Sequence, residues 1–444
     1  MYNRLRRSRT IGCLEFLYQF TQSNMPPPSP EKHHLAGKRI IVTGAGLAGL
    51  AFATALDQSW PDGHPKPELV LYERSLKELD REREGYTMSI KPESGLKTLK
   101  ELGLLEKALS HSTVDHNGIE TAPTIWNSKW QPQLDLNATR KPSQAGAAIP
   151  PTGIRLVRYM LRDMLLNAVP PHTTIHWGKG CEKAQLLPND RVRVTLADAS
   201  TSDCDLLIAA DGANSTIRAS LLPAQSLAYA GVVCCMGTSR FPPGEKPTPH
   251  AKGKWGINLS SKGVPFLPFP VDATTTVWAL SYRSAQPRER VRGTEAIAHR
   301  RELLEEVHQR GSHLQSPFRE MVQATDPRTL QVFSAAHKLP LSHAALLPST
   351  NVVLIGDANH PVTPFSGSGA NMALLDAVVL AQQLACCGSV GAAVSAFDAE
   401  SIPRARKAVN RGRFTIAVLH ARGFGFWVVR VLVGVVGLLV KYLR

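Results

Sequence analysis

Short apolar runs and longer helical patterns alternate along the first part of the chain. Residues 39–43 form an apolar run typical of a buried strand, and the Ala/Leu-rich stretch 47–56 has the length of a helix. A loop rich in Pro at 61–67 separates this helix from a second apolar run at 68–72. This succession predicts a β-α-β unit, from which parallel sheets are built.

The pattern becomes less regular up to residue 222. We expect one helix near 95–105 and another over 154–168, where apolar residues recur at helical spacing. Residues 191–196 alternate like a half-buried strand, and residues 205–209 form an apolar one. Residues 112–150 are rich in Pro and Asn and give no assignment.

The middle of the chain, residues 223–345, has a different character and predicts a separate sheet with a helix. Its expected elements are aromatic-bearing strands at 255–259, 265–269 and 274–282 and a helix near 295–309. A buried strand at 351–355 and an Ala/Leu-rich helix at 369–385 then return to the first pattern.

These elements predict an α/β fold in which a mixed β-sheet lobe is inserted into a Rossmann-like domain. The expected parts are an N-terminal extension (1–37), the first two segments of the Rossmann-like domain (38–222), the inserted substrate lobe (223–345), the third segment (346–400) and a C-terminal helical tail (401–444).

Composition and charge narrow the class of protein. A hydrophobic content of 43% in 444 residues indicates a globular protein. The seven cysteines include no C-x-x-C pair and no metal-ligand spacing, which favours reduced thiols in a cytosol-facing protein and predicts no metal site. The net charge of +15 does not predict nucleic-acid binding, because the chain contains no known binding motif.

The basic residues gather at the two ends of the chain. The N-terminal extension has no acidic residue before Glu15, which fits a targeting peptide; an upstream start codon, with Met25 opening the protein, is the reading we favour. After Glu400 there is no acidic residue, and basic residues precede an apolar stretch at 424–440 interrupted by Arg430. We therefore expect membrane association through 414–443, as an interfacial helix or a tail anchor; a helix that caps the substrate lobe is the alternative.

A G-x-G-x-x-G element lies between the first strand and the first helix. Gly44 permits the tight turn, Gly46 lets a pyrophosphate approach the backbone, and Gly49 allows the helix and strand to pack closely. Glu73 ends the next strand, where a carboxylate accepts hydrogen bonds from ribose hydroxyls. Together these residues predict a dinucleotide site, with a ligand-free Gly-rich turn as the alternative.

Three further motifs resemble those of the class A flavoprotein monooxygenases, the para-hydroxybenzoate hydroxylase-like family. Asp211-Gly212 follows an apolar strand, Gly356-Asp357 follows another, and a P-x-x-G-x-G-x-N tail comes next at 364–371. An R-x-x-L-R-x-x-L helix at 158–165 and the segment 85–91 are also similar to that family. The resemblance covers roughly residues 38–400 and reaches the natural-product branch of the family.

This resemblance implies a cofactor, FAD, and a co-substrate, NADPH or NADH. In such enzymes O2 adds to the reduced flavin, and the resulting C4a-hydroperoxide transfers one oxygen atom to an apolar or aromatic small molecule. The cofactor-binding residues that it implies, together with those of the Gly-rich turn, are Gly44, Gly46, Gly49, Glu73, Gly85, Arg158, Asp211, Asp357, Gly369 and Ala370. One departure is Ser368, because the family often has Gln there.

The Gly-rich tail also has a physical logic of its own. Gly367 and Gly369 let the chain approach a planar ring, and the helix that begins near Gly369 directs its N-terminus there. A helix N-terminus stabilises an anion by about 0.3–1 kcal/mol when exposed and by up to about 2 when partly buried. That bias would favour the reduced, negatively charged flavin.

The sequence assigns no catalytic side chain. His360 follows the second motif, but a structural role is expected for it. The aromatic residues of the middle lobe are expected in the core or in a pocket wall: Tyr229, Trp255, Trp278 and Tyr282.

The favoured function is the hydroxylation of an aromatic or polyketide-like secondary metabolite. The alternatives are a flavin dehydrogenase or an epoxidase acting on an apolar terpenoid-like substrate, and a non-enzymatic binding module on the same scaffold, as in the Rab escort relatives. A flavin halogenase is disfavoured because the W-x-W-x-I-P element is missing.

Overall fold

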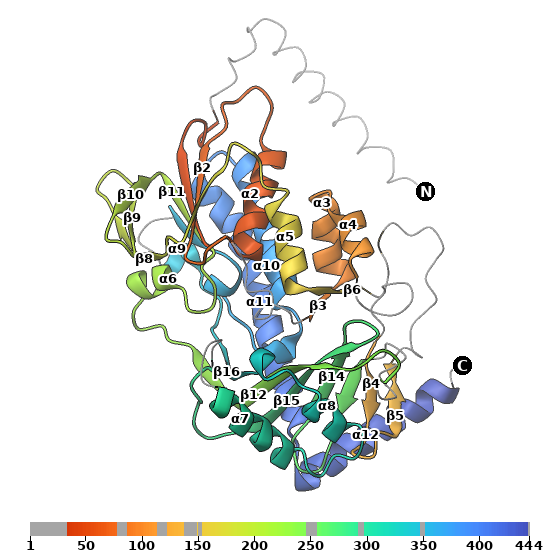
Figure 1. Cartoon of the computed structure of the whole chain (residues 1–444). Coiled ribbons are helices and arrows are strands. Elements are labelled where there is room, and N and C mark those ends of the chain that lie inside the picture. Colours follow the sequence, from red (N-terminus) through yellow and green to blue (C-terminus); the bar gives the residue numbers. More distant parts are fainter. Residues whose placement is uncertain are drawn as a thin grey trace, which may run out of the picture.

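The computed structural model describes residues 33–77, 87–112, 122–136, 149, 153–245, 255–291, 297–346 and 351–442. Figure 1 shows two lobes, one built around a parallel sheet and one around a larger mixed sheet. The predicted α/β class is confirmed.

The first lobe is organised by a five-stranded parallel sheet. Its strands, in spatial order, are β17 (Val352–Leu354), β11 (Leu206–Ala209), β1 (Arg39–Thr43), β2 (Glu68–Glu73) and β7 (Thr174–Trp177). All of these strands except the edge strand β7 are largely buried on both faces, which explains why their sequences are continuous apolar runs. Within β1, Ile40 and Val42 point to a helical layer, while Ile41 points to the opposite face.

Different elements cover these two faces. The helical layer consists of α2 (Leu47–Ser59), α5 (Arg158–Leu166) and α10 (Gly369–Cys386). The opposite face packs on an antiparallel sheet of β8 (Cys181–Leu186), β9 (Val192–Leu196) and β10 (Thr201–Cys204). The strands expected at 39–43, 68–72, 191–196, 205–209 and 351–355 and the helices expected at 47–56 and 369–385 are confirmed.

Two helix predictions are wrong in part. The segment 154–168 begins as β6 (Ile154–Val157), which pairs antiparallel with β3 (Thr87–Ile90), and becomes helical only at Arg158. The helix expected near 95–105 is divided into η1 (Pro92–Leu96), α3 (Lys97–Glu101) and α4 (Leu105–Ser110). Gly103 causes the break, because its φ of +71° is a left-handed conformation that ends a helix.

The second lobe contains a seven-stranded mixed sheet. Its strands, in spatial order, are β16 (Gln331–His337), β12 (Ala228–Arg240), β15 (Thr275–Arg283), β14 (Phe266–Pro270), β13 (Gly256–Asn258), β4 (Thr124–Trp126) and β5 (Pro132–Asp135). The helices α7 (Ile297–Arg310) and α8 (Phe318–Gln323) cover its outer face. The sequence did not predict β12, β16, β4 or β5, and the last two join this sheet from residues expected in the first lobe.

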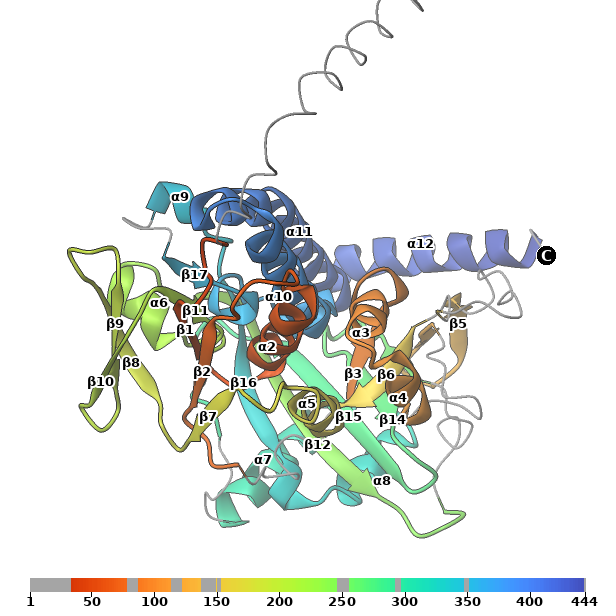
Figure 2. The same ribbon diagram turned by 90° about the horizontal axis from the view of Figure 1, so that it is seen from above.

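The remaining elements connect or extend the lobes. They are α6 (Thr216–Leu221), η4 (Pro327–Thr329), α9 (His343–Leu346), η5 (Gly356–Ala358), η6 (Pro364–Ser366), α11 (Val390–Leu419) and α12 (Gly423–Tyr442). The C-terminal tail is thus formed by two helices, and α11 begins ten residues before the predicted boundary at 400. Figure 2 shows α11 and α12 along one side of the molecule.

Candidate functional site

The candidate site lies where the parallel strands end. Gly44 follows β1, Glu73 ends β2, Asp211 follows β11 and Asp357 follows β17, so all four lie at the carboxyl edge of one sheet. The strand order reverses at β1, because β2 lies on one side of it and β11 on the other. Ligands of open α/β sheets bind at such a reversal point.

The Gly-rich turn has the shape that a phosphate requires. A Cβ on Gly44 would lie 2.6 Å from the Ala210 carbonyl oxygen, and its φ is +97°, so glycine is needed there. A Cβ on Gly49 would lie 2.0 Å from the carbonyl oxygen of Gly44. Gly46, by contrast, faces open space at the N-cap of α2. The cradle is therefore closed behind the turn and open in front of it, which fits a pyrophosphate group.

Two side chains from other elements hold this turn. Glu73 accepts hydrogen bonds from the backbone N–H groups of Ala45 and Ser75, both at 2.8 Å. Arg162 donates from Nε to the Ala45 carbonyl at 2.9 Å, and its buried Nη1 has no partner among the described residues. Arg162 belongs to the R-x-x-L-R motif, but sequence reasoning gave it no role.

Asp211 stabilises the start of α6 while leaving one oxygen available. Its Oδ2 accepts from the Ile217 N–H and the Thr216 hydroxyl, both at 3.3 Å. Its Oδ1 is buried and has no partner in the described part of the chain. Burial raises the pKa of Asp211, and hydrogen bonds only partly offset this rise. An unsatisfied buried acceptor at this edge fits a hydroxyl-bearing ligand.

Arg218 connects the segment that carries Asp211 with the segment that carries Asp357. Its guanidinium donates to the backbone carbonyls of Ala358 and Asn359 and to the side chain of Gln225. Ser215 caps the same short helix by accepting from the Arg218 N–H at 2.9 Å. The Asp-Gly and Gly-Asp segments, 140 residues apart, are therefore locked together.

Asp357 follows β17 and is exposed, although protein atoms surround its carboxyl group closely. The surrounding protein raises the pKa of its carboxyl group, while the positive charges of His360 and Arg158 lower it. Arg158, at the start of α5, is thus near Asp357. An exposed carboxylate at the carboxyl edge of the sheet is suited to the hydroxyls of a bound chain.

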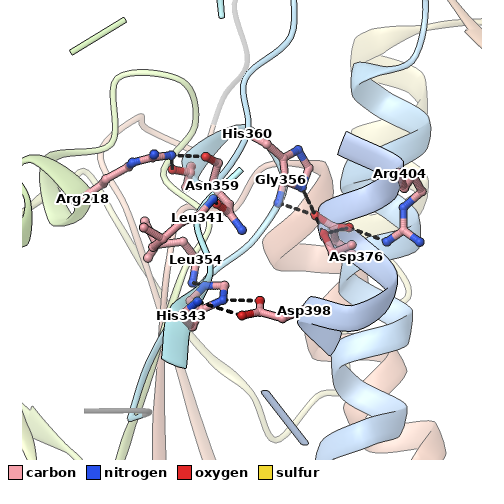
Figure 3. A network of polar contacts seen from close by, with 12 residues as sticks. Arg218, Leu341, His343, Leu354, Gly356, Asn359, His360, Asp376, Asp398 and Arg404 are labelled. Atoms are coloured by element: carbon pink, nitrogen blue, oxygen red, sulfur yellow. Dashed lines mark hydrogen bonds and ion pairs between the residues drawn. The ribbon is translucent and has the colours of Figure 1, made fainter. Parts of the chain in front are cut away.

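A buried hydrogen-bond network from α10 and α11 holds the Gly-Asp turn, formed by Gly356 and Asp357 (Figure 3). Asp376 of α10 accepts from the Gly356 N–H at 3.0 Å, from His360 at 2.5 Å and from Arg404 of α11 at 2.8 Å. Burial opposes charge on His360, but Asp376 outweighs it and raises the pKa of the imidazole. Burial likewise opposes charge on Asp376, yet His360 and Arg404 keep the pKa of the carboxyl below its usual range. His360 therefore has the structural contacts expected of it.

A second buried pair, His343 and Asp398, lies next to β17 (Figure 3). His343 contacts the Asp398 carboxylate of α11 through Nδ1 at 2.6 Å, and its Nε2 accepts from the Leu354 N–H. Leu354 is the last residue of β17, so this pair anchors α11 to the strand that carries Asp357.

The start of α10 is tied to the segment after β3. The Asn371 Oδ1 accepts from the Lys91 N–H at 2.8 Å and the Gly95 N–H at 3.3 Å, and Nδ2 donates to the Ser89 carbonyl at 2.7 Å. Lys91 Nζ also donates to Ser368 Oγ at 3.1 Å. Ser368, the residue that departs from the family pattern, thus accepts a hydrogen bond from a lysine of a distant segment.

Gly369 and Ala370 begin α10 and are half-buried beside this segment. Gly367 precedes them with a φ of +56°, which turns the chain into the helix. The position of a Cβ on Gly369 would be 3.9 Å from Asp357 Oδ1, so the helix start and the acidic turn adjoin. Gly85, the remaining predicted residue, lies outside the described residues.

The inner face of the seven-stranded sheet faces this site. Its Val232 and Cys234 pack on Ile416 of α11 and Phe365 of η6. On the same face, Met236, Ala279 and Leu267 are paired across three strands and are half-buried. These half-buried apolar side chains form a wall on the side of the sheet that faces the first lobe.

Arg155 of β6 reaches this wall from the first lobe. Its guanidinium lies 4.5 Å from the ring centre of Phe269 and 5.4 Å from that of Trp255. Thr87 of β3 accepts its hydrogen bonds through the hydroxyl and the carbonyl. A buried cation stacked on two aromatic rings is stabilised by their electron-rich faces.

The four aromatic residues singled out in the sequence divide between core and wall. Trp278 is fully buried and donates to Thr325, and Tyr282 is buried and donates to Glu306. Tyr229 donates to the Ser284 carbonyl, while Trp255 stacks on Phe269 at the inner face. Trp255 alone of the four contacts the wall.

Comparison with known proteins identifies relatives along most of the chain. A family model described as an FAD binding domain matches residues 38–412. Monooxygenase cfoF of Aspergillus candidus is 36% identical over 399 residues, which cover 88% of this chain and 93% of that protein. The 6-methylsalicylate 1-monooxygenase atA of Aspergillus terreus is 24% identical over 396 residues, covering 84% of this chain and 81% of that one.

A solved structure shares the same fold. HpxO of Klebsiella pneumoniae, complexed with FAD and uric acid, superposes with a TM-score of 0.70 at 22% identity. The match covers 90% of this chain and 94% of that chain.

Proposed function

The chain belongs to the FAD binding domain family and is an FAD-dependent monooxygenase, and from this premise we propose that it uses NAD(P)H and O2 to hydroxylate an aromatic or polyketide-like metabolite. The observation that carries the proposal is the convergence of Gly44, Glu73, Asp211 and Asp357 at one sheet edge. Bound FAD supplies the chemistry, since it accepts a hydride and activates O2.

The residues of the cradle would bind and orient the cofactor. Gly46 leaves room for the pyrophosphate at the N-terminus of α2, and Glu73 can accept from the ribose hydroxyls. Asp357 would accept hydrogen bonds from the ribityl chain, and Asp211 has an oxygen available nearby. The N-terminus of α10 at Gly369 would stabilise negative charge on the ring system.

The substrate would lie against the inner wall of the seven-stranded sheet. Met236, Leu267 and Phe269 are apolar and half-buried there, which suits an aromatic compound and excludes water from the reacting atoms. Arg155 could orient a phenolic or carboxyl oxygen of such a compound. The relative that oxidises 6-methylsalicylate supports an aromatic substrate class.

We further propose that this cytosol-facing enzyme associates with a membrane through residues 414–443. The support for this is the exposure of apolar residues in α12, which is almost entirely unburied over Gly423–Val440. The second long apolar helix, α10, is mostly buried in the first lobe and belongs to its core.

The reaction is tested by following NAD(P)H oxidation by the purified FAD-loaded protein with a panel of phenols and polyketides. We expect a substrate-dependent increase in the rate and a product heavier by about sixteen mass units, because one oxygen atom is added. Oxidation of a substrate without gain of oxygen would instead indicate the dehydrogenase alternative. A folded protein that binds these compounds without FAD would indicate the binding module.

A further inference from the structure

We propose that α12 is an in-plane anchor, which lies flat on the surface of an anionic phospholipid bilayer instead of crossing it. The inference rests on the proposed membrane association of residues 414–443 and not on the proposed reaction. Four features of the described residues carry it: the exposed apolar side chains, the packed face of the helix, the position of Arg430 and the surrounding charge.

Most large hydrophobic side chains that are exposed in the described part of the chain belong to α12. They are Phe424, Trp427, Val431, Leu432, Val435, Val436, Leu438 and Leu439, each between 41% and 78% exposed. At about 100° per residue, these positions fall within roughly half of the circumference of the helix. An uninterrupted apolar arc of this size on a monomer indicates an interaction surface.

The opposite side of α12 packs on the protein. Phe426, Val429, Val433, Gly437 and Val440 share the other half of the circumference and are less exposed. Gly437 lies against β5, since a Cβ there would be 2.9 Å from the Gln133 carbonyl oxygen. Because β5 is the edge strand of the sheet, α12 packs along the open edge of that sheet.

This packing excludes a spanning helix as long as the fold is kept. A helix that crosses a bilayer is surrounded by lipid, and here the sheet edge would have to enter the hydrocarbon with it. A helix that lies in the interface needs only one apolar face, and in the described part of the chain α12 has such a face exposed. Its length of about 30 Å would then lie parallel to the membrane surface.

Arg430 fits this orientation. In the sequence it interrupts an apolar stretch, which disfavours burial in hydrocarbon. On the helix it is exposed and lies at the border between the packed face and the apolar arc. A long side chain at that border reaches the headgroup level while the arc enters the membrane.

The charge of the neighbouring helix selects an anionic surface. The chain has no acidic residue after Glu400, and α11 exposes Arg406, Lys407, Arg411 and Arg413. Figure 2 shows α11 and α12 on the same side of the molecule, so the helix that carries these cations adjoins the helix that carries the apolar arc. Clusters of basic residues beside an apolar helix bind acidic headgroups.

The test is co-sedimentation of the FAD-loaded full-length protein with phosphatidylcholine vesicles, with and without phosphatidylserine. We expect binding to the anionic vesicles that weakens with salt, because headgroup attraction is screened. The double variant L432E/V435E should weaken binding by more than about tenfold, whereas L76E, at an exposed leucine outside α12, should bind like the wild type. Equal FAD content in all three proteins shows that each one is folded.

Two outcomes overturn the proposal. Wild-type protein that stays in the pellet after alkaline carbonate extraction would show a spanning helix, so that membrane association would stand and the in-plane orientation would fail. Failure to bind any vesicle, together with a dimer that L432E/V435E dissociates in sedimentation velocity, would assign the arc to a second copy of the chain.

Discussion

At the scale of single residues, the glycines of the Gly-rich turn have two different roles, one in the fold and one in ligand binding. Gly44 and Gly49 are required by the protein itself, because a Cβ on either would collide with a backbone carbonyl oxygen. Gly46 has an ordinary φ of −87° and open space in front of it. No steric contact within the described part of the protein requires glycine at position 46, so the open space in front of it is available to a bound group.

The variant G46A should therefore remain folded and lose FAD. We expect an unfolding free energy within about 1 kcal/mol of the wild type, since alanine is only a poorer N-cap. We also expect FAD affinity to fall by at least about tenfold, because the Cβ occupies the space of the pyrophosphate. Fluorescence titration of the apoprotein and thermal unfolding measure the two effects.

The contrasting variant G44A should destabilise the protein itself. The positive φ and the collision with Ala210 should together lower the free energy of unfolding by more than about 2 kcal/mol. G63A has a similar positive φ of +79° but no neighbouring atom within 4 Å, so it measures the backbone strain alone. Equal losses in G44A and G63A would contradict the close approach.

A buried histidine should make the protein sensitive to acid. His420 contacts the Ile416 carbonyl through Nδ1 and Ser281 through Nε2, and since a carbonyl only accepts, Nδ1 carries the proton of the neutral ring. Burial lowers the pKa of His420 to about 4 from 6.5. Between these pH values the unfolded chain binds more protons than the folded one, so stability falls as the pH falls.

As the pH falls from 6.5 to 4, we expect this histidine to lower the free energy of unfolding by up to about 3 kcal/mol. The variant H420Q should show a shallower pH dependence in urea unfolding, because glutamine has no proton to gain. H111Q, at an exposed histidine, serves as the control and should retain the wild-type slope. Parallel slopes for wild type and H420Q would exclude the effect.

At the scale of elements, strands buried on both faces could be predicted and strands with broken patterns could not. The strand β1 is a continuous apolar run, whereas β12 contains Gly231 and Gly237 and a bulge between Tyr229 and Val233 that disrupts its alternation. β6 and α5 form one apolar stretch, so periodicity alone could not show where strand becomes helix.

The site could be predicted only where its residues belong to local motifs. The glycines of the first turn follow from spacing, and Asp357 from a family resemblance. Contacts between distant segments could not be found in this way: Asn371 contacts Lys91, after β3, across 280 residues, and Arg404 reaches Asp376 from another helix. Neither side chain has a local pattern that indicates its partner.

The junction at Asn371 should therefore control cofactor binding. N371A removes the hydrogen bonds of Asn371 with the Lys91 and Gly95 N–H groups and with the Ser89 carbonyl, each of which contributes about 0.5–1.5 kcal/mol. We expect FAD to bind at least about tenfold more weakly as the α10 start loosens. N371D, which keeps the acceptor, should lose less.

The matched control for this junction is Q382A on the exposed side of the same helix. The Gln382 amide reaches Glu101 at only 3.5 Å, so its removal should leave FAD binding unchanged. If N371A bound FAD as tightly as Q382A, the α10 start would not depend on the segment after β3.

At the scale of the whole molecule, three separated segments converge at the sheet edge where we propose the cofactor site, and the second lobe provides the wall proposed for the substrate. Arg218, Asp376 and Asn371 connect these segments, and α11 contacts both the Gly-Asp turn and the inner face of the large sheet. The cofactor site is therefore a product of the complete fold and not of any one motif.

The most direct measurement of this claim is the amount of FAD bound per chain by the full-length protein and by one variant in each of the three segments. We predict one FAD per chain in the wild type and a loss of at least about tenfold in affinity for each of G46A, D211A and D357A, with folding preserved. A folded wild-type protein that binds no FAD, or a segment whose variant binds it normally, would contradict the account.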